Sequence, residues 1–121
     1  MNDMEKCLLK AKKMGCKSIV CLGALGGRLD HSLSSMHIST KFGREHPDMQ
    51  VMIVGDNNMM YLLCPNQKYR IHVGDFMEKK GCGLVPFCKA DNIETTGFRW
   101  NLGKECQFSC LEWGSFISTS N

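Results

Sequence analysis

The chain has 121 residues, of which 43% are hydrophobic and 22% are charged. This composition supplies enough apolar side chains for a packed core and excludes an intrinsically disordered segment, which combines low hydrophobicity with high net charge. The longest apolar runs, such as 51–54, are far shorter than the ~20 residues of a membrane-spanning helix, so no membrane partner is expected. The N-terminal residues lack the apolar block of a secretory signal, which favours a cytoplasmic protein.

The formal net charge is +3, and all of the excess lies in residues 1–54, which hold eight Lys and Arg against five Asp and Glu. Residues 55–121 hold seven of each. The isoelectric point is about 8.4, whereas a dedicated nucleic-acid-binding domain usually exceeds about 9. The charge therefore hints at an anionic ligand of the first half, and no nucleic-acid partner is expected.

Eight cysteines are present, but the sequence contains no Cys-x-x-Cys pair. Cys7 falls on the apolar stripe of a helical pattern, and Cys21 lies within an apolar run. Cys106 and Cys110 have the spacing of a half-site but lack a matching second pair. We therefore expect free, mostly buried thiols, with a zinc site or disulfides as the alternatives.

The N-terminal segment carries the local signals of a helix. Asn2, followed by Glu5 three residues later, is a capping-box signature, and Gly15 supplies a stop. Between them, apolar residues recur at helical spacing at Met4, Cys7, Leu8, Ala11 and Met14. The pattern predicts an amphipathic helix that ends just before Gly15.

Two short apolar runs, 18–22 and 50–54, predict buried strands. A second helix is expected between them, ending near Gly43, with a stripe formed by Leu33, Met36, His37 and Thr40. The order helix, strand, Gly-rich loop, helix, strand is typical of an open α/β sheet with parallel strands. Two helices are too few to cover both faces of such a sheet, so we expect a partial domain.

The pattern changes at about residue 55, after which turns rich in Gly, Asn, Asp and Pro separate short apolar runs. These runs lie at 59–63, 69–73, 84–87 and 117–119. Regular short runs between such turns predict strands of an antiparallel β-sandwich. The predicted fold is α/β plus all-β: a partial parallel-sheet α/β domain over 1–55, followed by a β-sandwich over 56–121.

The segment 23–31, Gly-Ala-Leu-Gly-Gly-Arg-Leu-Asp-His, carries the most chemistry. It follows a predicted strand and opens a helix, which is where α/β sheets bind ligands. Gly26 and Gly27 allow the backbone to approach a phosphate group, and the Arg28 guanidinium suits phosphate oxygens. Asp30 suits a hard cation such as Mg²⁺. The alternative is a tight turn in which Asp30 caps the helix and Arg28 is solvated.

Together with the C-terminal Gly114-x-x-x-Ser118-Thr119-Ser120-Asn121, this loop makes the sequence resemble the thiamine pyrophosphokinase family, also called thiamine diphosphokinase. That family carries a Gly-Gly-Arg-x-Asp-His/Gln loop in an α/β domain and a Ser-Thr-Ser-Asn run in a following β-sandwich. Its Thr-Asp-Phe-x-Lys-Cys/Ala-Leu segment is similar to residues 2–8, where Asn2 replaces the usual Thr. Residues 59–63, 83–86 and 95–102 also resemble sandwich segments of the family.

The resemblance implies an enzyme that transfers the terminal diphosphate of ATP to the hydroxyethyl oxygen of thiamine, giving thiamine diphosphate and AMP. It implies a homodimer with sites between the subunits, and Mg²⁺ as the cofactor. Two residues would be catalytic, Asp30 and Arg28. The ATP-binding residues would be Gly26, Gly27, Arg28 and His31. The thiamine-binding residues would be Ser118, Ser120 and Asn121, and the metal ligands Asp30 and Asp3.

Several of these residues have alternatives. Asp3 equally suits the first position of a helix, where the dipole favours an acidic side chain, and a first-turn histidine such as His31 is often partly solvated. Trp100 and Trp113 fit a sandwich core better than a cation–π contact with the thiazolium ring. The family's acidic Gly-Asp-Phe-Asp-Ser motif is missing from this sequence, so a non-catalytic binding or dimerisation remnant is the alternative function.

Overall fold

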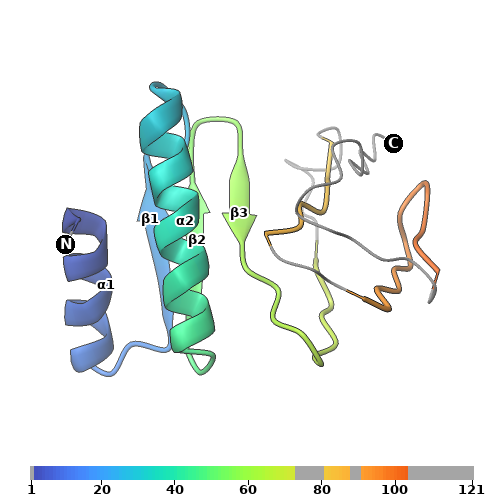
Figure 1. Cartoon of the computed structure of the whole chain (residues 1–121), viewed down its shortest axis with the longest axis horizontal. Coiled ribbons are helices and arrows are strands. Elements are labelled where there is room, and N and C mark those ends of the chain that lie inside the picture. The colour runs from blue at the N-terminus through green and yellow to red at the C-terminus, as the bar shows by residue number, and fades with distance from the viewer. Residues whose placement is uncertain (1, 73–80, 88–90, 104–121) are drawn as a thin grey trace. The chain divides into compact units, whose positions relative to one another are not determined.

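The computed structural model describes residues 2–72, 81–87 and 91–103, and the chain divides into two units after Gln67. The regular elements lie in the first unit (Figure 1). They are α1 (Asp3–Lys13), β1 (Ser18–Leu22), α2 (Leu29–Glu45), β2 (Gln50–Val54) and β3 (Met59–Tyr61). The domain limits 1–55 and 56–121 stay a prediction.

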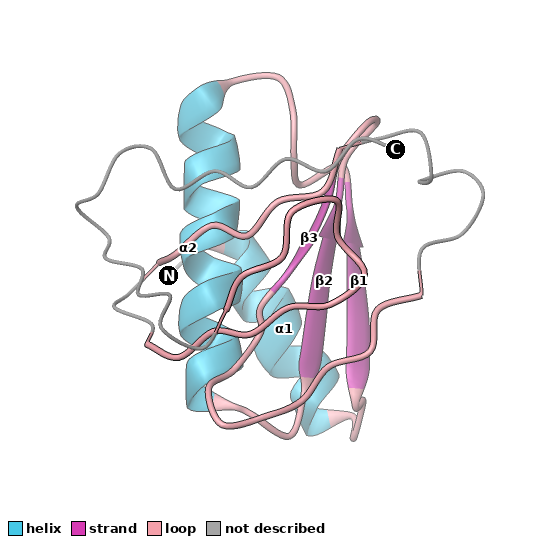
Figure 2. Ribbon diagram, turned by 90° about the vertical axis from the view of Figure 1, so that its right-hand side faces the viewer, coloured by secondary structure: helices cyan, strands magenta, loops and turns pink. Residues whose placement is uncertain are grey.

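The first unit is built on one mixed sheet with the strand order β1-β2-β3. β1 and β2 run parallel, with Ser18 opposite Gln50 and Leu22 opposite Val54. Helix α2 connects these two strands, and both helices lie on the same face of the sheet (Figure 2). The predicted α/β arrangement with two parallel strands is confirmed.

The third strand differs from the sequence-based prediction. The run 59–63 was expected within the β-sandwich, but β3 pairs antiparallel with β2, and Met60 lies opposite Ile53. A tight turn produces this pairing, because the Gly55 N–H donates to the Asn58 carbonyl at 2.8 Å and returns the chain along β2. Residues 59–61 therefore extend the sheet of the first unit.

The described residues of the second unit, 68–72, 81–87 and 91–103, contain no strand. The strands predicted at 69–73 and 84–87 are thus absent where those residues are described, and 117–119 lies outside the described residues. An extended run becomes a strand only when a second run pairs with its backbone groups, and sequence spacing does not supply that partner. The β-sandwich stays a prediction.

Helix α1 begins and ends where its local signals predict. The Asn2 side chain accepts a hydrogen bond from the Met4 N–H at 2.9 Å. At the other end Gly15 adopts a φ of +82°, and the Cys16 N–H donates to the Ala11 carbonyl at 3.2 Å. These bonds satisfy backbone groups that a helix leaves open at its termini.

Contacts between elements override two other local predictions. The Glu5 carboxylate accepts a hydrogen bond from Lys41 of α2 at 2.9 Å, so an ion pair between helices replaces the second half of the capping box. Helix α2 continues through Gly43 to Glu45. Gly43 is buried close to the Leu62 side chain, so its small size serves packing rather than helix termination.

The core of the first unit lies between the helices and the sheet. Its buried hydrophobic members are Leu8, Ile38, Phe42, Met49, Val51 and Ile53. The stripe predicted for α2 is confirmed in part, because Thr40 is buried and Met36 packs against the core, whereas Leu33 and His37 are exposed. Periodicity identifies an amphipathic helix, but the position of the sheet decides which residues of that helix are buried.

Strand β1 is covered on one face. Ile19 and Cys21 pack against the core, whereas Val20 and Leu22 are 53% and 79% exposed. The prediction of a buried strand is therefore wrong for β1, because the described helices cover one face of the sheet. Neither of these helices is long and apolar enough to cross a membrane.

No disulfide joins any two of the five described cysteines, in line with the expected thiols. Cys7, Cys16 and Cys82 are exposed, and Cys21 and Cys64 are partly buried, so the expectation of mostly buried thiols is wrong for this set. Burial raises the pKa of the Cys21 thiol. Helical spacing placed Cys7 on the apolar stripe, but α1 buries a narrower face, on which Leu8 is the fully buried residue.

Candidate functional site

The Gly-rich loop, residues 23–28, connects the carboxyl end of β1 to the start of α2 (Figure 1). Gly26 and Gly27 have φ values of +107° and +67°. L-residues with side chains rarely adopt such values, so the loop conformation requires glycine at these positions. The sequence thus places an exposed backbone turn where parallel α/β sheets bind ligands.

Arg28 and Asp30 form a charged pair at the end of this loop. The Arg28 Nε donates to Asp30 Oδ1 at 3.1 Å, and Nη2 donates to Oδ2 at 2.6 Å. Both side chains are exposed. Arg28 is the N-cap residue of α2 and Asp30 lies in the first turn, so the alternative in which Asp30 caps the helix is wrong. The hydrogen bond from Arg28 holds the pKa of Asp30 below its ordinary value.

This pair leaves binding capacity for an anion. A guanidinium has five N–H donors, and the bonds to Asp30 use two of them. The α2 N-terminus beside it has no side-chain cap, and it adds backbone N–H groups and the positive end of the helix dipole. Arg28 and the first turn of α2 can therefore bind phosphate oxygens while Asp30 keeps the guanidinium in place.

Ser32 is a site residue that the sequence analysis missed. Its Oγ accepts a hydrogen bond from the Gly26 N–H at 3.1 Å and donates one to the Gly26 carbonyl at 3.2 Å. The residue is 8% exposed. A serine near the start of a helix is common, so its sequence signal is weak. The Gly26 N–H is engaged inside the loop, and a contact of Gly26 with a ligand would have to use other atoms.

Asp3 and His31, the other predicted residues of this region, are both exposed. Asp3 is the first residue of α1 and accepts a hydrogen bond from Lys6 Nζ at 2.9 Å, as an N-terminal helical residue would. An electrostatic contribution from His31 also lowers the pKa of Asp30, after the larger effect of the hydrogen bond from Arg28. The ends of the two helices are linked because Asn2 Nδ2 donates to Ser34 Oγ at 3.4 Å.

The described residues alone do not make a magnesium site. Asp30 is bonded to Arg28, and Asp3 is bonded to Lys6. Over 2–72, 81–87 and 91–103 there is no group of three or more His, Cys, Asp or Glu side chains that would hold a metal ion. Mg²⁺ usually takes one or two carboxylates together with waters and substrate phosphates. Asp30 and Asp3 would therefore need further ligands.

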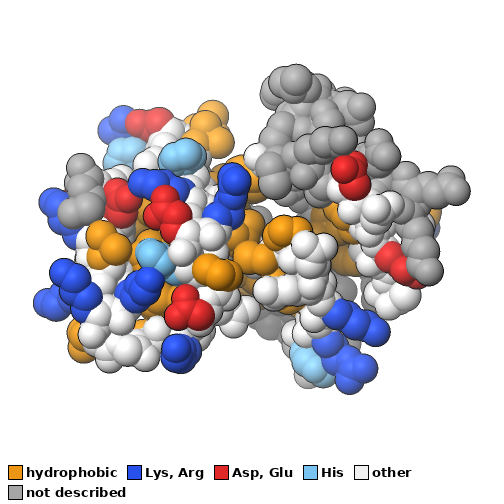
Figure 3. All heavy atoms as spheres, turned by 60° about the horizontal axis from the view of Figure 1, so that its bottom comes forward, with side chains coloured by type: hydrophobic (Ala, Val, Ile, Leu, Met, Phe, Trp, Pro, Cys, Tyr) orange, Lys and Arg blue, Asp and Glu red, His pale blue; other side chains and the backbone are white. Residues whose placement is uncertain are grey.

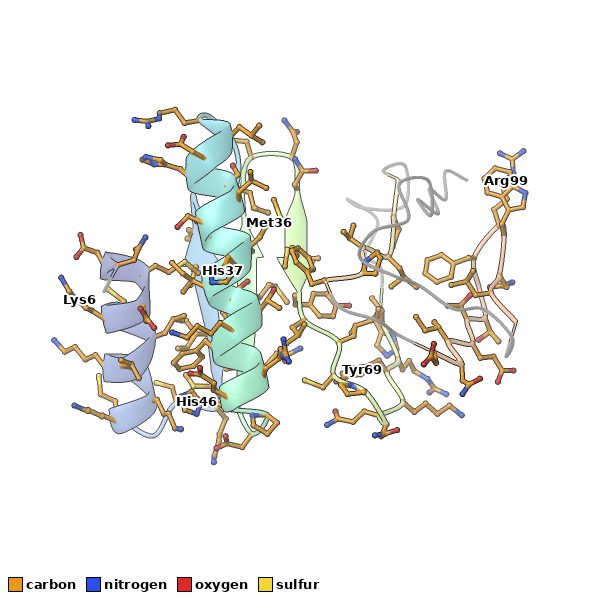
Figure 4. All side chains as sticks on the ribbon, in the orientation of Figure 1. Lys6, Met36, His37, His46, Tyr69 and Arg99 are labelled. Carbon is orange, nitrogen blue, oxygen red and sulfur yellow. The ribbon has the colours of Figure 1, made fainter. Side chains whose placement is uncertain are left out.

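His37 of α2 and His46, the residue that follows α2, have separate surroundings. His37 and His46 lie at different levels of the helix, as Figure 4 shows. His46 packs edge-on against the Phe42 ring with centroids 4.5 Å apart, and its Nδ1 lies 2.6 Å from Lys12 Nζ. These contacts give His46 a structural role at the end of α2.

In the second unit, residues 95–102 form a closed loop. The Thr95 N–H donates to the Leu102 carbonyl at 3.1 Å, and the Asn101 side chain bonds to the Phe98 backbone at both N–H and carbonyl. Trp100 is 58% exposed, with the Arg99 guanidinium 4.7 Å from its ring centroid. The prediction that Trp100 belongs to a sandwich core is therefore wrong.

Four other predicted residues lie outside the described residues. They are Trp113, Ser118, Ser120 and Asn121. Their predicted roles in the sandwich core and in thiamine binding stay predictions.

Among the described residues, basic and acidic side chains are interspersed on the face shown in Figure 3, in keeping with the small net charge of +3.

Two protein-family models match this chain. Residues 1–53 match the thiamin pyrophosphokinase catalytic domain, and residues 68–121 match the thiamin pyrophosphokinase vitamin B1 binding domain. The first match contains α1, the Gly-rich loop and α2. The second contains the closed loop 95–102 and the C-terminal Ser-Thr-Ser-Asn run.

Similar proteins include thiamine pyrophosphokinases of plants and a nematode. Thiamine pyrophosphokinase 1 of Oryza sativa subsp. japonica is 33% identical over 85% of this chain and 36% of its own length. Thiamine pyrophosphokinase 3 of the same species is 31% identical over 99% of this chain and 45% of its own. Thiamin pyrophosphokinase 1 of Caenorhabditis elegans is 33% identical over 87% and 41%. The chain thus spans less than half the length of these relatives.

Proposed function

This chain belongs to the thiamin pyrophosphokinase family, and we propose that it is part of an enzyme that transfers diphosphate from ATP to thiamine, giving thiamine diphosphate and AMP. The observation that carries the proposal is the Gly-rich loop at the carboxyl end of β1, with the Arg28–Asp30 pair at the start of α2. This segment lies within the match to the catalytic domain.

The proposed role of Arg28 follows from the charge that moves in the reaction. Diphosphate transfer spreads negative charge over oxygens that a guanidinium can bind with two parallel N–H bonds. The bidentate bond to Asp30 fixes the guanidinium plane beside the α2 N-terminus. Holding the donor group in place before the reaction is the main contribution a protein makes to this chemistry.

The two substrates would depend on different parts of the chain. ATP would depend on Gly26, Gly27, Arg28 and His31 of the loop region. Thiamine would depend on Ser118, Ser120 and Asn121, whose neutral hydroxyl and amide groups suit the donor and acceptor edge of an aminopyrimidine. Mg²⁺ is proposed as cofactor on the family resemblance, with Asp30 and Asp3 among its ligands. A homodimer with sites between the subunits is proposed on the same ground, and the cytoplasmic location stays an expectation from the sequence.

The test is steady-state kinetics on the enzyme that contains this sequence, with ATP and thiamine varied separately. Arg28→Ala should chiefly weaken ATP use, by about 2–4 kcal/mol of transition-state stabilisation. Ser120→Ala should chiefly raise the thiamine requirement, by about 1–2 kcal/mol for one lost hydrogen bond. If both variants weakened thiamine use alone, the assignment of the loop to ATP would be wrong.

A second ion pair of the first unit supplies matched controls. Lys17 and Asp48 are exposed, 3.8 Å apart, and flank the opposite ends of β1 and β2 from the loop. Lys17→Ala and Asp48→Asn remove the same charges as Arg28→Ala and Asp30→Asn, so they should leave both substrate requirements unchanged. Activity that Asp30→Asn does not reduce would remove Asp30 from the proposed catalytic and metal-binding residues.

A non-catalytic binding or dimerisation role is the second candidate. The observation behind it is that the described residues contain no group of three or more His, Cys, Asp or Glu side chains that would hold a metal ion. Titration calorimetry of the 121-residue chain with ATP, beside a turnover assay, separates the two. Binding without formation of thiamine diphosphate would favour this candidate for the isolated chain.

A further inference from the structure

The Gly-rich loop is fixed to the sheet at two points before its pair of glycines. The Gly23 N–H donates to the Val54 carbonyl at 2.7 Å, which continues the β1–β2 pairing by one residue. The Leu25 carbonyl then passes close to Gly55, where a Cβ atom would lie 2.2 Å from its oxygen. The first half of the loop therefore depends on β2 and the turn that follows it.

A third attachment comes from α2. The Ser32 hydroxyl bonds to both backbone groups of Gly26, accepting from the N–H at 3.1 Å and donating to the carbonyl at 3.2 Å. Ser32 as a whole is 8% exposed, so these two hydrogen bonds lie in a part-buried position. Without the Ser32 hydroxyl, the Gly26 N–H and carbonyl would both lose this hydrogen-bond partner. Gly26 also has a φ of +107°, a conformation that glycine alone adopts easily.

The segment beyond this attachment is open to a ligand. A Cβ atom on Gly27 would find no atom within 4 Å, so the space above it is open. Arg28 follows directly, with its guanidinium held by Asp30. The three contacts are made by Gly23, Leu25 and Gly26. Because Gly27 and Arg28 follow directly, these contacts fix the position from which their backbone continues.

We propose that Ser32 is a positioning residue for the nucleotide, which holds Gly26 so that the Gly27–Arg28 backbone and the Arg28 side chain are preorganised for the phosphates of ATP. This inference rests on the proposed function. Ser32 does not contact the ATP phosphates in this scheme; it acts through Gly26. Its removal lowers ATP affinity and leaves thiamine binding intact, since thiamine is assigned to the other end of the chain.

Ser39 provides a matched control on the same helix. It is 2% exposed, and its hydroxyl donates to the Met36 carbonyl at 3.1 Å, away from the loop. Ser39→Ala therefore removes a buried serine hydroxyl and its hydrogen bond without touching Gly26. Ser32→Cys is a second variant of nearly unchanged size, in which the weak S–H donor replaces the hydroxyl.

The experiment measures KM for ATP and for thiamine in the enzyme containing this sequence, with the midpoint of thermal unfolding for each variant. Ser32→Ala is expected to raise KM for ATP about tenfold and to leave KM for thiamine unchanged. Ser32→Cys is expected to change it in the same direction by a smaller factor, which keeps the test valid if Ser32→Ala does not fold. Ser39→Ala lowers the unfolding midpoint but neither KM.

Calorimetric titration with ATP alone distinguishes the two ways of failing. A wild-type enzyme that neither binds ATP nor forms thiamine diphosphate overturns the proposed function and this inference together. An active wild-type enzyme whose KM for ATP is the same in Ser32→Ala or Ser32→Cys overturns the inference alone. So does a Ser32 variant in which the two KM values rise equally, because a general loss of structure would produce that result.

Discussion

Gly55→Ala tests whether the sheet holds the Gly-rich loop in place. The added Cβ would lie 2.2 Å from the Leu25 carbonyl oxygen and 2.9 Å from the Leu25 Cβ, whereas ordinary contacts begin at 3.4 Å. Leu25 would have to move by about 1 Å, and it is backbone that must move. We expect a loss of about 1–3 kcal/mol in the free energy of unfolding, the usual cost of such overpacking.

Alanine substitutions at two other glycines serve as controls for this loss of stability. At Gly43 a Cβ would lie 2.8 Å from Cδ2 of Leu62, the far end of a flexible side chain. The alanine would also gain up to about 1 kcal/mol of helix propensity within α2, so Gly43→Ala should change stability by less than about 1 kcal/mol. At Gly103 a Cβ would meet nothing within 4 Å, and Gly103→Ala should be neutral within about 0.5 kcal/mol.

Urea unfolding of the three variants and the wild type, followed by far-ultraviolet circular dichroism, measures the differences at equilibrium. The expected order of destabilisation places Gly55→Ala first, well apart from the other two. A Gly55→Ala protein as stable as the wild type would show that the Leu25 carbonyl moves without cost. The contact between Leu25 and Gly55 would then not hold the loop in place or contribute to its preorganisation.

Three further changes follow from the described contacts. Ile53→Ala empties a fully buried site (0% exposed) and should cost about 2–5 kcal/mol in the same urea assay. Asn2→Ala removes the acceptor for the Met4 N–H. It should lower the free energy of unfolding by about 0.5–2 kcal/mol and reduce the helical circular dichroism signal. Arg28→Gln should raise the pKa of Asp30 toward its ordinary value, measured by NMR titration of the carboxyl group, because the bond from Arg28 is the main cause of the lowered pKa. Since that pKa is lower in the folded state, the stabilisation by the pair is present at neutral pH and is lost as the pH falls through it, so wild type and Arg28→Gln should converge in stability at acid pH. A difference that persists below that pKa would contradict this account.

The sequence by itself determined the features that depend on a few neighbouring residues. The Asn2 cap, the Gly15 stop and the strand limits at 18–22 and 50–54 are each encoded within a short stretch, because hydrogen bonds at helix ends and apolar runs act locally. The segment 23–31 was identified in the same way, since its glycines, arginine and aspartate appear in order between a strand and a helix. The family resemblance rested on these same ordered motifs and is confirmed.

Tertiary structure decided which of those residues act on one another. The pairing of β3 with β2, the exposure of Val20 and Leu22, and the passage of α2 through Gly43 depend on where the sheet and Leu62 lie. No local pattern distinguishes a glycine that ends a helix from one that makes room for a side chain. Pairing partners and buried faces are set by contacts between residues distant in sequence, which periodicity does not specify.

The candidate site shows the same division. Sequence alone selected Gly26, Arg28 and Asp30, because their chemistry is legible from residue type and order. The folded chain decided that Arg28 rather than Asp30 occupies the cap position, and that the Ser32 hydroxyl returns to Gly26. A serine six residues beyond a glycine carries no signal until the turn between them brings its hydroxyl within 3.1 Å of the Gly26 nitrogen. The loop's composition is therefore a property of the sequence, whereas its fixed shape is a property of the fold around it.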